Sequence, residues 1–204
     1  MSSTEQASPS TAAFHRVVAD GTRTLLLAAG LDPDSAQLKD TPSRVAKAWR
    51  ERLAGYAQDP AEVLGRTFPS EGYDEMIVLG GIGFHSTCEH HLLPFSGTAT
   101  VGYIPDPTSK RIVGLSKLAR LVDLYANRLQ VQERMTRQVA DALAQHLAPV
   151  GIGVLVQAAH SCMACRGIRK PGVMTTSVLV GAMREDAAVR AEFLALALQH
   201  GGKL

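Results

Sequence analysis

Four consecutive residues, Cys88-Glu89-His90-His91, carry side chains that bind metal ions or transfer protons. Much later in the chain, His160-Ser161-Cys162 again puts a histidine beside a cysteine. Cys88 and His91 are three residues apart, and Cys162 offers a third ligand from a distance. Zinc binds thiolate and imidazole in tetrahedral geometry, and a catalytic site leaves one position for water. The two stretches therefore predict one open zinc site, with His90 and His160 left to transfer protons.

Two other interpretations of these residues stay open. Cys162-Met163-Ala164-Cys165 is a C-x-x-C motif, so Cys165 is a candidate fourth ligand of a closed, structural zinc site. A lone histidine is more often an ordinary surface or core residue, but the clustering argues against that explanation here. Glu89 is a candidate for orienting a ligand or the backbone rather than binding the metal.

A second group of residues is suited to anions and to a purine base. Ser116, Lys117 and Arg120 stand at the start of an expected helix, where the helix dipole and two cations favour phosphate. A solvated basic face is the plainer explanation of this trio. Arg166 lies in a basic, glycine-containing stretch and can complete a phosphate clamp. The chain has neither a Walker loop nor a GxGxxG fingerprint, so a nucleotide would be held in another way.

Gln132 and Glu133 open the next expected helix. A glutamate in a first turn often only complements the helix dipole. A carboxylate beside an amide also matches the hydrogen-bonding edge of guanine, because a carboxylate accepts two parallel N–H bonds. These two residues are therefore candidates for binding the base.

Hydrophobic periodicity predicts the elements that would position these residues. Helices are expected over residues 12–29, 41–55, 116–125, 131–147 and 187–199, and strands over 76–79, 95–104, 151–159 and 173–180. The order strand, strand, helix, helix, strand, strand predicts an α+β fold with an antiparallel sheet and two helices packed on it. We expect a disordered tail over 1–11, an N-terminal helical segment over 12–72 and a catalytic domain over 73–204.

Composition narrows the class of protein. The chain has 204 residues, and its net charge of +2 gives no broad footprint for nucleic acid or an anionic membrane. The sequence shows neither a long apolar run nor a signal peptide, so we expect a cytoplasmic protein. Thiols in that compartment are usually reduced, which favours metal binding over disulfides for the three cysteines.

Taken together, these motifs resemble the GTP cyclohydrolase I family. The resemblance is carried by DTPSRVA (residues 40–46), STCEHHLLPF, GLSKLARLVDLYA, QVQER, HSCMACRGIRKPG and TTS (residues 175–177). It covers nearly everything after the tail and first helix. It implies the tunnelling fold, a homodecamer of two stacked pentamers, and conversion of GTP and water into 7,8-dihydroneopterin triphosphate and formate.

The resemblance also implies roles for individual residues. Cys88, His91 and Cys162 would bind one zinc ion per subunit, which would activate water for attack on guanine C8. His160 and His90 would transfer protons, and Ser116 would assist rearrangement of the sugar. The guanine would be held by Gln132 and Glu133. The triphosphate would be bound by Lys117, Arg120 and Arg166, and by Arg44 and Lys47 of a neighbouring subunit.

Three positions depart from the family pattern. Leu129 stands where a proline is common, Ala159 where an acidic residue often precedes the histidine, and Cys165 is an additional thiol. None of these changes removes an implied ligand or base. Two alternatives to the enzyme of folate synthesis remain: a non-catalytic relative with a structural zinc, and an enzyme that feeds 7-deazapurine synthesis through the same first step.

Overall fold

The computed structural model describes residues 11–200, which divide into two compact units between Ala57 and Gln58. The first unit contains α1 (Thr11–Ala28), α2 (Thr41–Arg52) and the short 3-10 helix η1 (Ala54–Ala57). The α1 and α2 helices pack together, and a hydrogen bond of 3.2 Å joins His15 Nε2 to Ser43 Oγ. Both long helices agree with the predicted ones. The division falls earlier than the expected boundary after residue 72, and the expected tail lies outside the described residues except for Thr11, which begins α1.

The second unit is built on a five-stranded sheet with the strand order β5-β2-β3-β6-β7. Its strands are β2 (Ile77–Cys88), β3 (Pro94–Ile104), β5 (Leu129–Gln130), β6 (Gly151–His160) and β7 (Val173–Gly181). Neighbouring strands are antiparallel except for β5, which pairs with β2 in parallel over two residues. The predicted antiparallel sheet is therefore confirmed, with β5 as a parallel addition at its edge.

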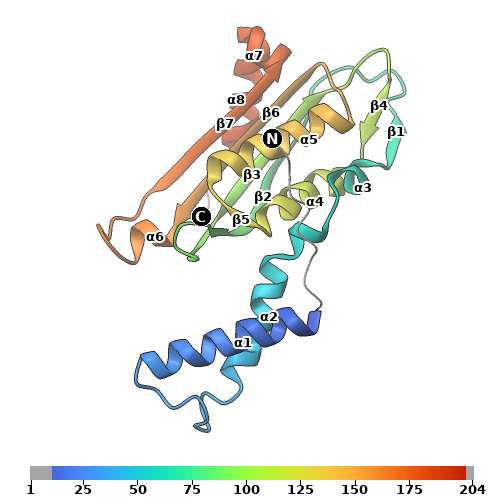
Figure 1. Cartoon of the computed structure of the whole chain (residues 1–204). Helices are drawn as coiled ribbons and strands as arrows, with labels where there is room; N and C mark the ends of the chain where they lie inside the picture. The colour runs from blue at the N-terminus through green and yellow to red at the C-terminus, as the bar shows by residue number, and fades with distance from the viewer. Residues whose placement is uncertain (1–10, 201–204) are drawn as a thin grey trace, which may run out of the picture. The chain divides into compact units, whose positions relative to one another are not determined.

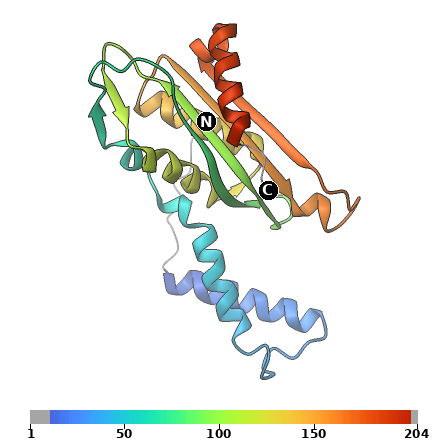
Figure 2. The ribbon, with the colours of Figure 1, turned by 180° about the vertical axis from the view of Figure 1, so that it is seen from behind.

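Helices cover both faces of this sheet (Figures 1 and 2). One face carries α4 (Leu115–Ala126) and α5 (Gln132–His146), and the opposite face carries α8 (Ala187–His200). The strand β6 serves both faces, because its side chains alternate. Val154 and Val156 point to the helices α4 and α5, while Leu155 packs with Phe193 of α8.

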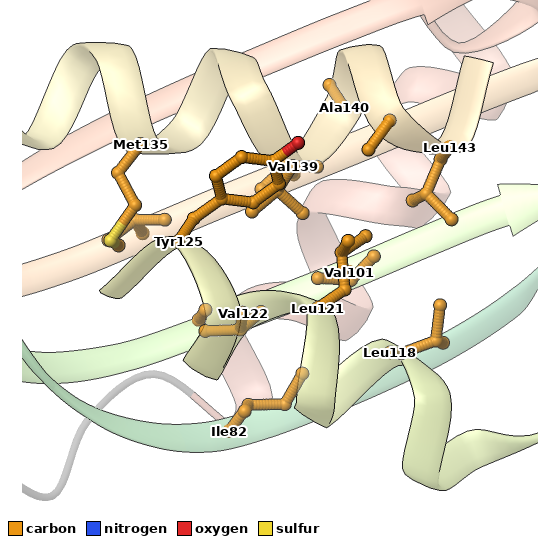
Figure 3. Close-up of a cluster of buried hydrophobic side chains, with 14 of the residues drawn as sticks. Ile82, Val101, Leu118, Leu121, Val122, Tyr125, Met135, Val139, Ala140 and Leu143 are labelled. Atoms are coloured by element: carbon orange, nitrogen blue, oxygen red, sulfur yellow. The ribbon is translucent and has the colours of Figure 1, made fainter. Parts of the chain in front are cut away.

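The main core lies between the sheet and the two helices α4 and α5 (Figure 3). Met135, Val139 and Leu143 recur at intervals of four residues along α5, so they form one buried stripe. Leu121 and Val122 lie three and four residues after Leu118 on α4, and all three are fully buried on one face. These contacts fix both helices on the strands, and thereby fix the start of α5 beside the end of β6.

Shorter elements complete the second unit. They are α3 (Pro60–Leu64), a two-stranded sheet of β1 (Thr67–Pro69) and β4 (Arg111–Val113), α6 (Ser161–Ala164) and α7 (Ala182–Glu185). None of these was expected from periodicity, because each is too short to show a period. Among the described helices, none combines the length and the apolar character needed to cross a membrane.

Candidate active site

The three predicted metal ligands meet at one end of the sheet. Cys88 is the last residue of β2, and His91 follows it in the turn to β3. On β3, Phe95 lies opposite His160, the last residue of β6, so the start of α6 with Cys162 comes next to that turn. The ligand atoms of Cys88, His91 and Cys162 all lie within 4.8 Å of one another. The register of β3 and β6 thus brings Cys162 next to Cys88 and His91, although it lies some seventy residues later in the chain.

The donor set fits a zinc ion. Cys88 Sγ and His91 Nδ1 are 3.7 Å apart. Tetrahedral zinc, with bonds of about 2.3 Å to sulfur and 2.0–2.1 Å to nitrogen, places such a pair about 3.6 Å apart. Burial raises the pKa of the Cys162 thiol, and the neighbouring Cys88 thiol raises it further. Cys165 is exposed at the end of α6 and does not belong to this group, so the described residues supply three ligands rather than four.

His160 is held against the sheet by two contacts. Its ring stacks on Phe95 with centroids 4.6 Å apart and an interplanar angle of 4°. Its Nε2 atom lies 2.8 Å from Oε1 of Gln132, the first residue of α5. Burial lowers the pKa of His160, although the Glu133 carboxylate opposes that shift. A ring so placed is neutral near pH 7 and fixed in orientation.

The amide of Gln132 determines which nitrogen of His160 carries the proton. Gln132 is 1% exposed, and its Nε2 atom donates to the carbonyl oxygens of Val156 and Met174 and to Thr176 Oγ1. Carbonyl oxygens only accept, so the amide nitrogen must face them and Oε1 must face His160. Because Oε1 only accepts, His160 Nε2 is the donor and Nδ1 of the neutral ring is free of a proton. The predicted contact of Gln132 with guanine stays a prediction.

Three more predicted residues lie near these groups. His90 is exposed in the turn, with its ring edge-on to His91 at 6.3 Å. Glu133 is exposed in the first turn of α5, close enough for its charge to act on His160. Arg166 follows α6, and its charge lowers the pKa of Cys162, which partly offsets the effect of burial. One chain therefore brings His90, His160, Glu133 and Arg166 close to the three predicted metal ligands.

The Ser116, Lys117 and Arg120 trio lies at the other end of the sheet. These residues belong to the first half of α4, which follows β4 directly. The Val113 N–H at the end of β4 donates to Tyr103 Oη. Tyr103 is eight residues from Phe95 along β3, a separation of about 27 Å at about 3.4 Å per residue. Figure 1 shows β4 at one end of the sheet and α6 at the other. The sequence predicted that the metal ligands and this trio surround one nucleotide, but within one chain the fold holds them at opposite ends of the sheet.

Arg44 and Lys47 belong to the first unit. Both are exposed on α2, one turn apart, and Arg44 forms an exposed ion pair of 3.2 Å with Asp40. Their predicted contact with a triphosphate stays a prediction.

The structure also adds residues that sequence reasoning did not assign. Phe95 stacks on His160, Thr176 accepts a hydrogen bond from Gln132, and Arg134 pairs with Glu89. Phe95 ends STCEHHLLPF, Arg134 ends QVQER and Thr176 lies in TTS, so all three stood within the motifs used. Their types alone, an aromatic ring, a surface charge and a hydroxyl, gave no signal of what they contact.

Comparison with known proteins agrees with the geometry. The profile of the family described as GTP cyclohydrolase I matches residues 18–198. GTP cyclohydrolase 1 of Mycobacterium ulcerans is 56% identical over 178 residues, covering 87% of each chain. The protein of that name from Mycolicibacterium vanbaalenii is 54% identical over 191 residues, covering 93% of this chain and 94% of the relative. The one from Streptomyces coelicolor is 54% identical over 174 residues, covering 85% and 86%. The chain therefore belongs to the GTP cyclohydrolase I family.

Proposed function

We propose that this protein is a zinc-dependent GTP cyclohydrolase that converts GTP and water into 7,8-dihydroneopterin triphosphate and formate, the first step of pterin and tetrahydrofolate synthesis. The observation that carries the proposal is the group of three ligand atoms within 4.8 Å, beside an oriented histidine, in a chain of this family. A zinc ion held there supplies Lewis-acid activation of water near neutral pH. A purely structural site would not require the partly buried Gln132–His160 hydrogen bond.

His160 is the residue best placed to move protons at the purine ring. Its Nε2–H is bound to Gln132, so Nδ1 is the atom that accepts and returns a proton. Stacking on Phe95 prevents the ring from turning away. The lowered pKa keeps His160 in the basic form at neutral pH. His90, exposed beside the metal ligands, is the second proton carrier for the later steps.

Glu133 is the candidate for recognising guanine. Its carboxylate is exposed in the first turn of α5, beside the buried Gln132 that orients His160. A carboxylate accepts the two parallel N–H groups of the guanine edge. The same helical turn would then place the base relative to the histidine that acts on it.

The triphosphate contacts argue for a site shared between subunits. Arg166 lies near the metal ligands of its own chain, whereas Ser116, Lys117 and Arg120 lie too far along the sheet to contact the same nucleotide. We infer that these three residues serve the site of a second copy, and that Arg44 and Lys47 come from a neighbouring copy too. A homodecamer of two pentamers, with one zinc per subunit, would bring them together. Cations around the phosphates supply binding energy away from the reacting carbon. Neither nucleic acid nor a membrane is needed, and a cytoplasmic location stays a prediction.

Product analysis tests the reaction. The purified, zinc-loaded protein is incubated with GTP, and formate and the fluorescent pterin formed after oxidation are measured. Both products should appear in equal amounts. Release of neither product by a zinc-loaded oligomer would contradict the enzymatic proposal.

Two cysteine variants test the metal site. Cys162→Ser should lose zinc and activity together, because its thiolate is one of three ligands. Cys165→Ser is the matched control, since it changes a thiol three residues away that lies outside the ligand group. Loss of zinc in the Cys165 variant would instead support a four-ligand structural site.

Mixed oligomers test the shared site. Cys162→Ser and Lys117→Ala subunits should each be inactive alone, because each lacks one part of the site. Co-expressed, they should regain activity in those sites that combine the intact metal end of one chain with the intact α4 of another. If mixing restores nothing although mixed oligomers form, both parts act within a single chain.

A further inference from the structure

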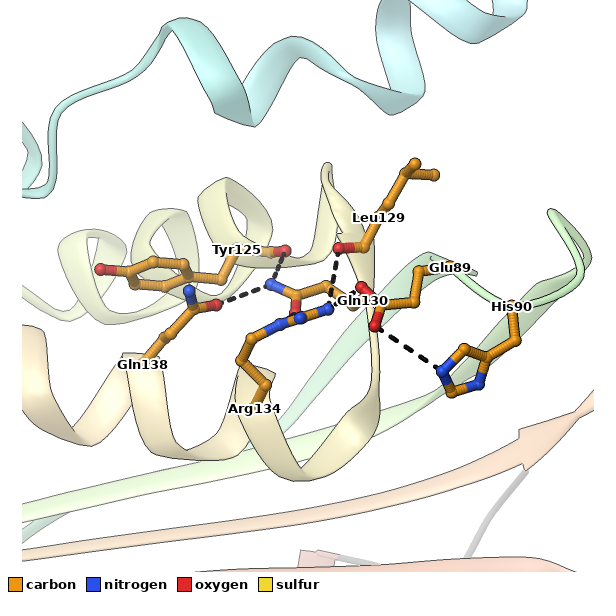
Figure 4. A network of polar contacts seen from close by, with 7 residues as sticks. All are labelled: Glu89, His90, Tyr125, Leu129, Gln130, Arg134 and Gln138. Carbon is orange, nitrogen blue, oxygen red and sulfur yellow. Dashed lines mark hydrogen bonds and ion pairs between the residues drawn. The ribbon is translucent and has the colours of Figure 1, made fainter. Parts of the chain in front are cut away.

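The carboxylate of Glu89 lies between the guanidinium of Arg134 and the ring of His90 (Figure 4). Glu89 lies in the turn after β2, between the metal ligands Cys88 and His91. Its Oε2 atom accepts from Arg134 Nη2, and its Oε1 atom lies 3.7 Å from His90 Nε2. One side chain of this turn, residues 88–92, which we call the metal turn, therefore contacts both α5 and the exposed ring of His90.

Arg134 is itself held by a buried anchor. Its Nε atom donates to Gln130 Oε1 at 3.2 Å, and Gln130 is 1% exposed. The Gln130 amide nitrogen donates to the Tyr125 carbonyl oxygen at 2.9 Å and to Gln138 Oε1 at 2.8 Å. Figure 4 shows this chain of contacts running from α4 and α5 to the turn. The guanidinium thus has a fixed position, unlike that of a freely moving surface arginine.

Backbone contacts also join the metal turn to Gln130. The Glu89 N–H donates to the Gln130 carbonyl oxygen at 3.0 Å, and Cys88 lies opposite Gln130 where β2 pairs with β5. Leu92 closes the turn in a left-handed conformation, with φ of 55°. A short turn with ligands at both ends has little freedom to relax, so a change at Glu89 should displace the side chains of Cys88 and His91.

Arg134 also stands next to the residues that serve the base and the acid–base histidine. Gln132 orients His160, and Glu133 is the candidate guanine ligand. The first turn of α5 therefore carries three side chains with three targets: His160, the base and the metal turn. The Glu89–Arg134 contact is the side-chain link between that helical turn and the residues Cys88 to His91.

An exposed ion pair without such a role is the alternative. Pairs of that kind contribute about 0–1 kcal/mol to stability and nothing to activity. The same helix offers an example in Arg137 and Asp141, which are 3.7 Å apart, with side chains 51% and 61% exposed. Among the described residues, that pair has no hydrogen bond to the metal turn or to the buried Gln130.

We propose that Glu89 and Arg134 are positioning residues, which hold the metal-binding turn and the His90 ring in register with the first turn of α5. The kinetic part of this inference rests on the proposed function. The expected effect on zinc affinity does not rest on it, because a turn that is held less firmly binds zinc less tightly whatever reaction the protein catalyses.

The test compares Glu89→Gln, Arg134→Gln and the double variant with Arg137→Gln. Zinc affinity is measured by competition with a chromophoric chelator, and kcat and KM for GTP by formate release. Loss of a residue that orients metal ligands typically weakens affinity or activity about 10- to 100-fold. We expect that loss in zinc affinity and in kcat for each single variant, with KM unchanged, because the proposed function assigns neither residue to binding of the nucleotide. The double variant should lose no more than the single ones, and Arg137→Gln should match the wild type.

Two other results overturn the inference, and a third separates it from the proposed function. If Glu89→Gln and Arg134→Gln bind zinc and turn over as Arg137→Gln does, the pair is an ordinary surface ion pair. If the two losses multiply in the double variant, the residues act separately. If the wild-type protein does not act on GTP, the proposed function fails, and the zinc affinities alone still decide whether the pair positions the turn.

Discussion

Replacing Gln132 by methionine separates two roles for this residue. Methionine has a similar length but no amide. The change removes the acceptor of His160 Nε2 at 2.8 Å and the donor to Val156 O, Met174 O and Thr176 Oγ1 at 3.0–3.1 Å. If the amide positions His160, its loss lowers kcat. If the amide binds guanine, its loss raises KM.

The size of the effect follows from those contacts. Thr176 Oγ1 keeps its partner Thr136 Oγ1 at 2.7 Å, so the lost contacts that matter are those to the carbonyl oxygens and to His160. Leaving buried polar groups unpaired costs about 1–3 kcal/mol, and we expect a loss of stability in that range rather than a sum over every contact. For a unit of this size the corresponding fall in Tm is about 2–12 °C. A displaced catalytic ring lowers kcat on the order of a hundredfold.

Steady-state kinetics with GTP distinguish the two roles. Positioning predicts a lower kcat, nearly constant KM and normal zinc content. Gln157→Met is the matched control on β6: Gln157 Oε1 is buried without a hydrogen-bond partner among the described residues, and Nε2 makes one long, exposed contact of 3.5 Å to Thr175 Oγ1, so loss of this amide should cost little stability and no activity. A Gln132→Met enzyme with full kcat and raised KM would refute the positioning role and favour direct binding of the base.

Three further predictions concern the scaffold. Gly97→Ala should unfold the second unit or lower its Tm sharply in calorimetry, because the new Cβ would lie 1.9 Å from the Gln157 carbonyl oxygen; a wild-type Tm would contradict the strand packing. Tyr103→Phe should lower stability by about 1–3 kcal/mol in urea unfolding, because the buried Val113 N–H loses its acceptor. The backbone N–H groups of Ser109 and Thr108 lower the pKa of the Asp106 carboxyl. Its folded pKa is below the unfolded value of about 3.9, so its stabilisation is present above that pH and is lost as the pH falls through the folded pKa. The Tm advantage over Asp106→Asn should therefore shrink between pH 7 and pH 3, and a constant difference would refute the charge effect.

The long elements were predictable because their burial pattern repeats. Apolar stripes indicate α1, α2, α4 and α5, a largely apolar run indicates α8, and β-branched runs indicate the central strands. The strand β2 was predicted over 76–79 but continues to Cys88. Glycines interrupt its apolar run, and the register shifts between Leu79 and Ile82, where Gly81 has φ of 68°. A bulge of this kind hides a continuing strand from a simple count of alternation.

The metal ligands were predictable for a different reason. Zinc accepts few side-chain types, so a cysteine and histidine cluster is informative even without knowledge of the fold. The fold then decides what lies around them. Ser116, Lys117 and Arg120 were correctly assigned to the start of a helix, but only the register of β3 shows that this end of α4 is far from Cys88 in the same chain.

Charged residues show where sequence reasoning ends. The helical period predicts that Arg134 and Arg137 face outward on α5, because the buried stripe follows Met135 and Val139. It does not predict their partners, since an exposed arginine is satisfied by any carboxylate within reach. Arg137 finds a neighbour on its own helix, which contributes little, whereas Arg134 finds Glu89, 45 residues earlier in the chain. What distinguishes them is the short parallel pairing of β5 with β2, which brings the metal turn to α5 and is too short to leave a signal in the sequence.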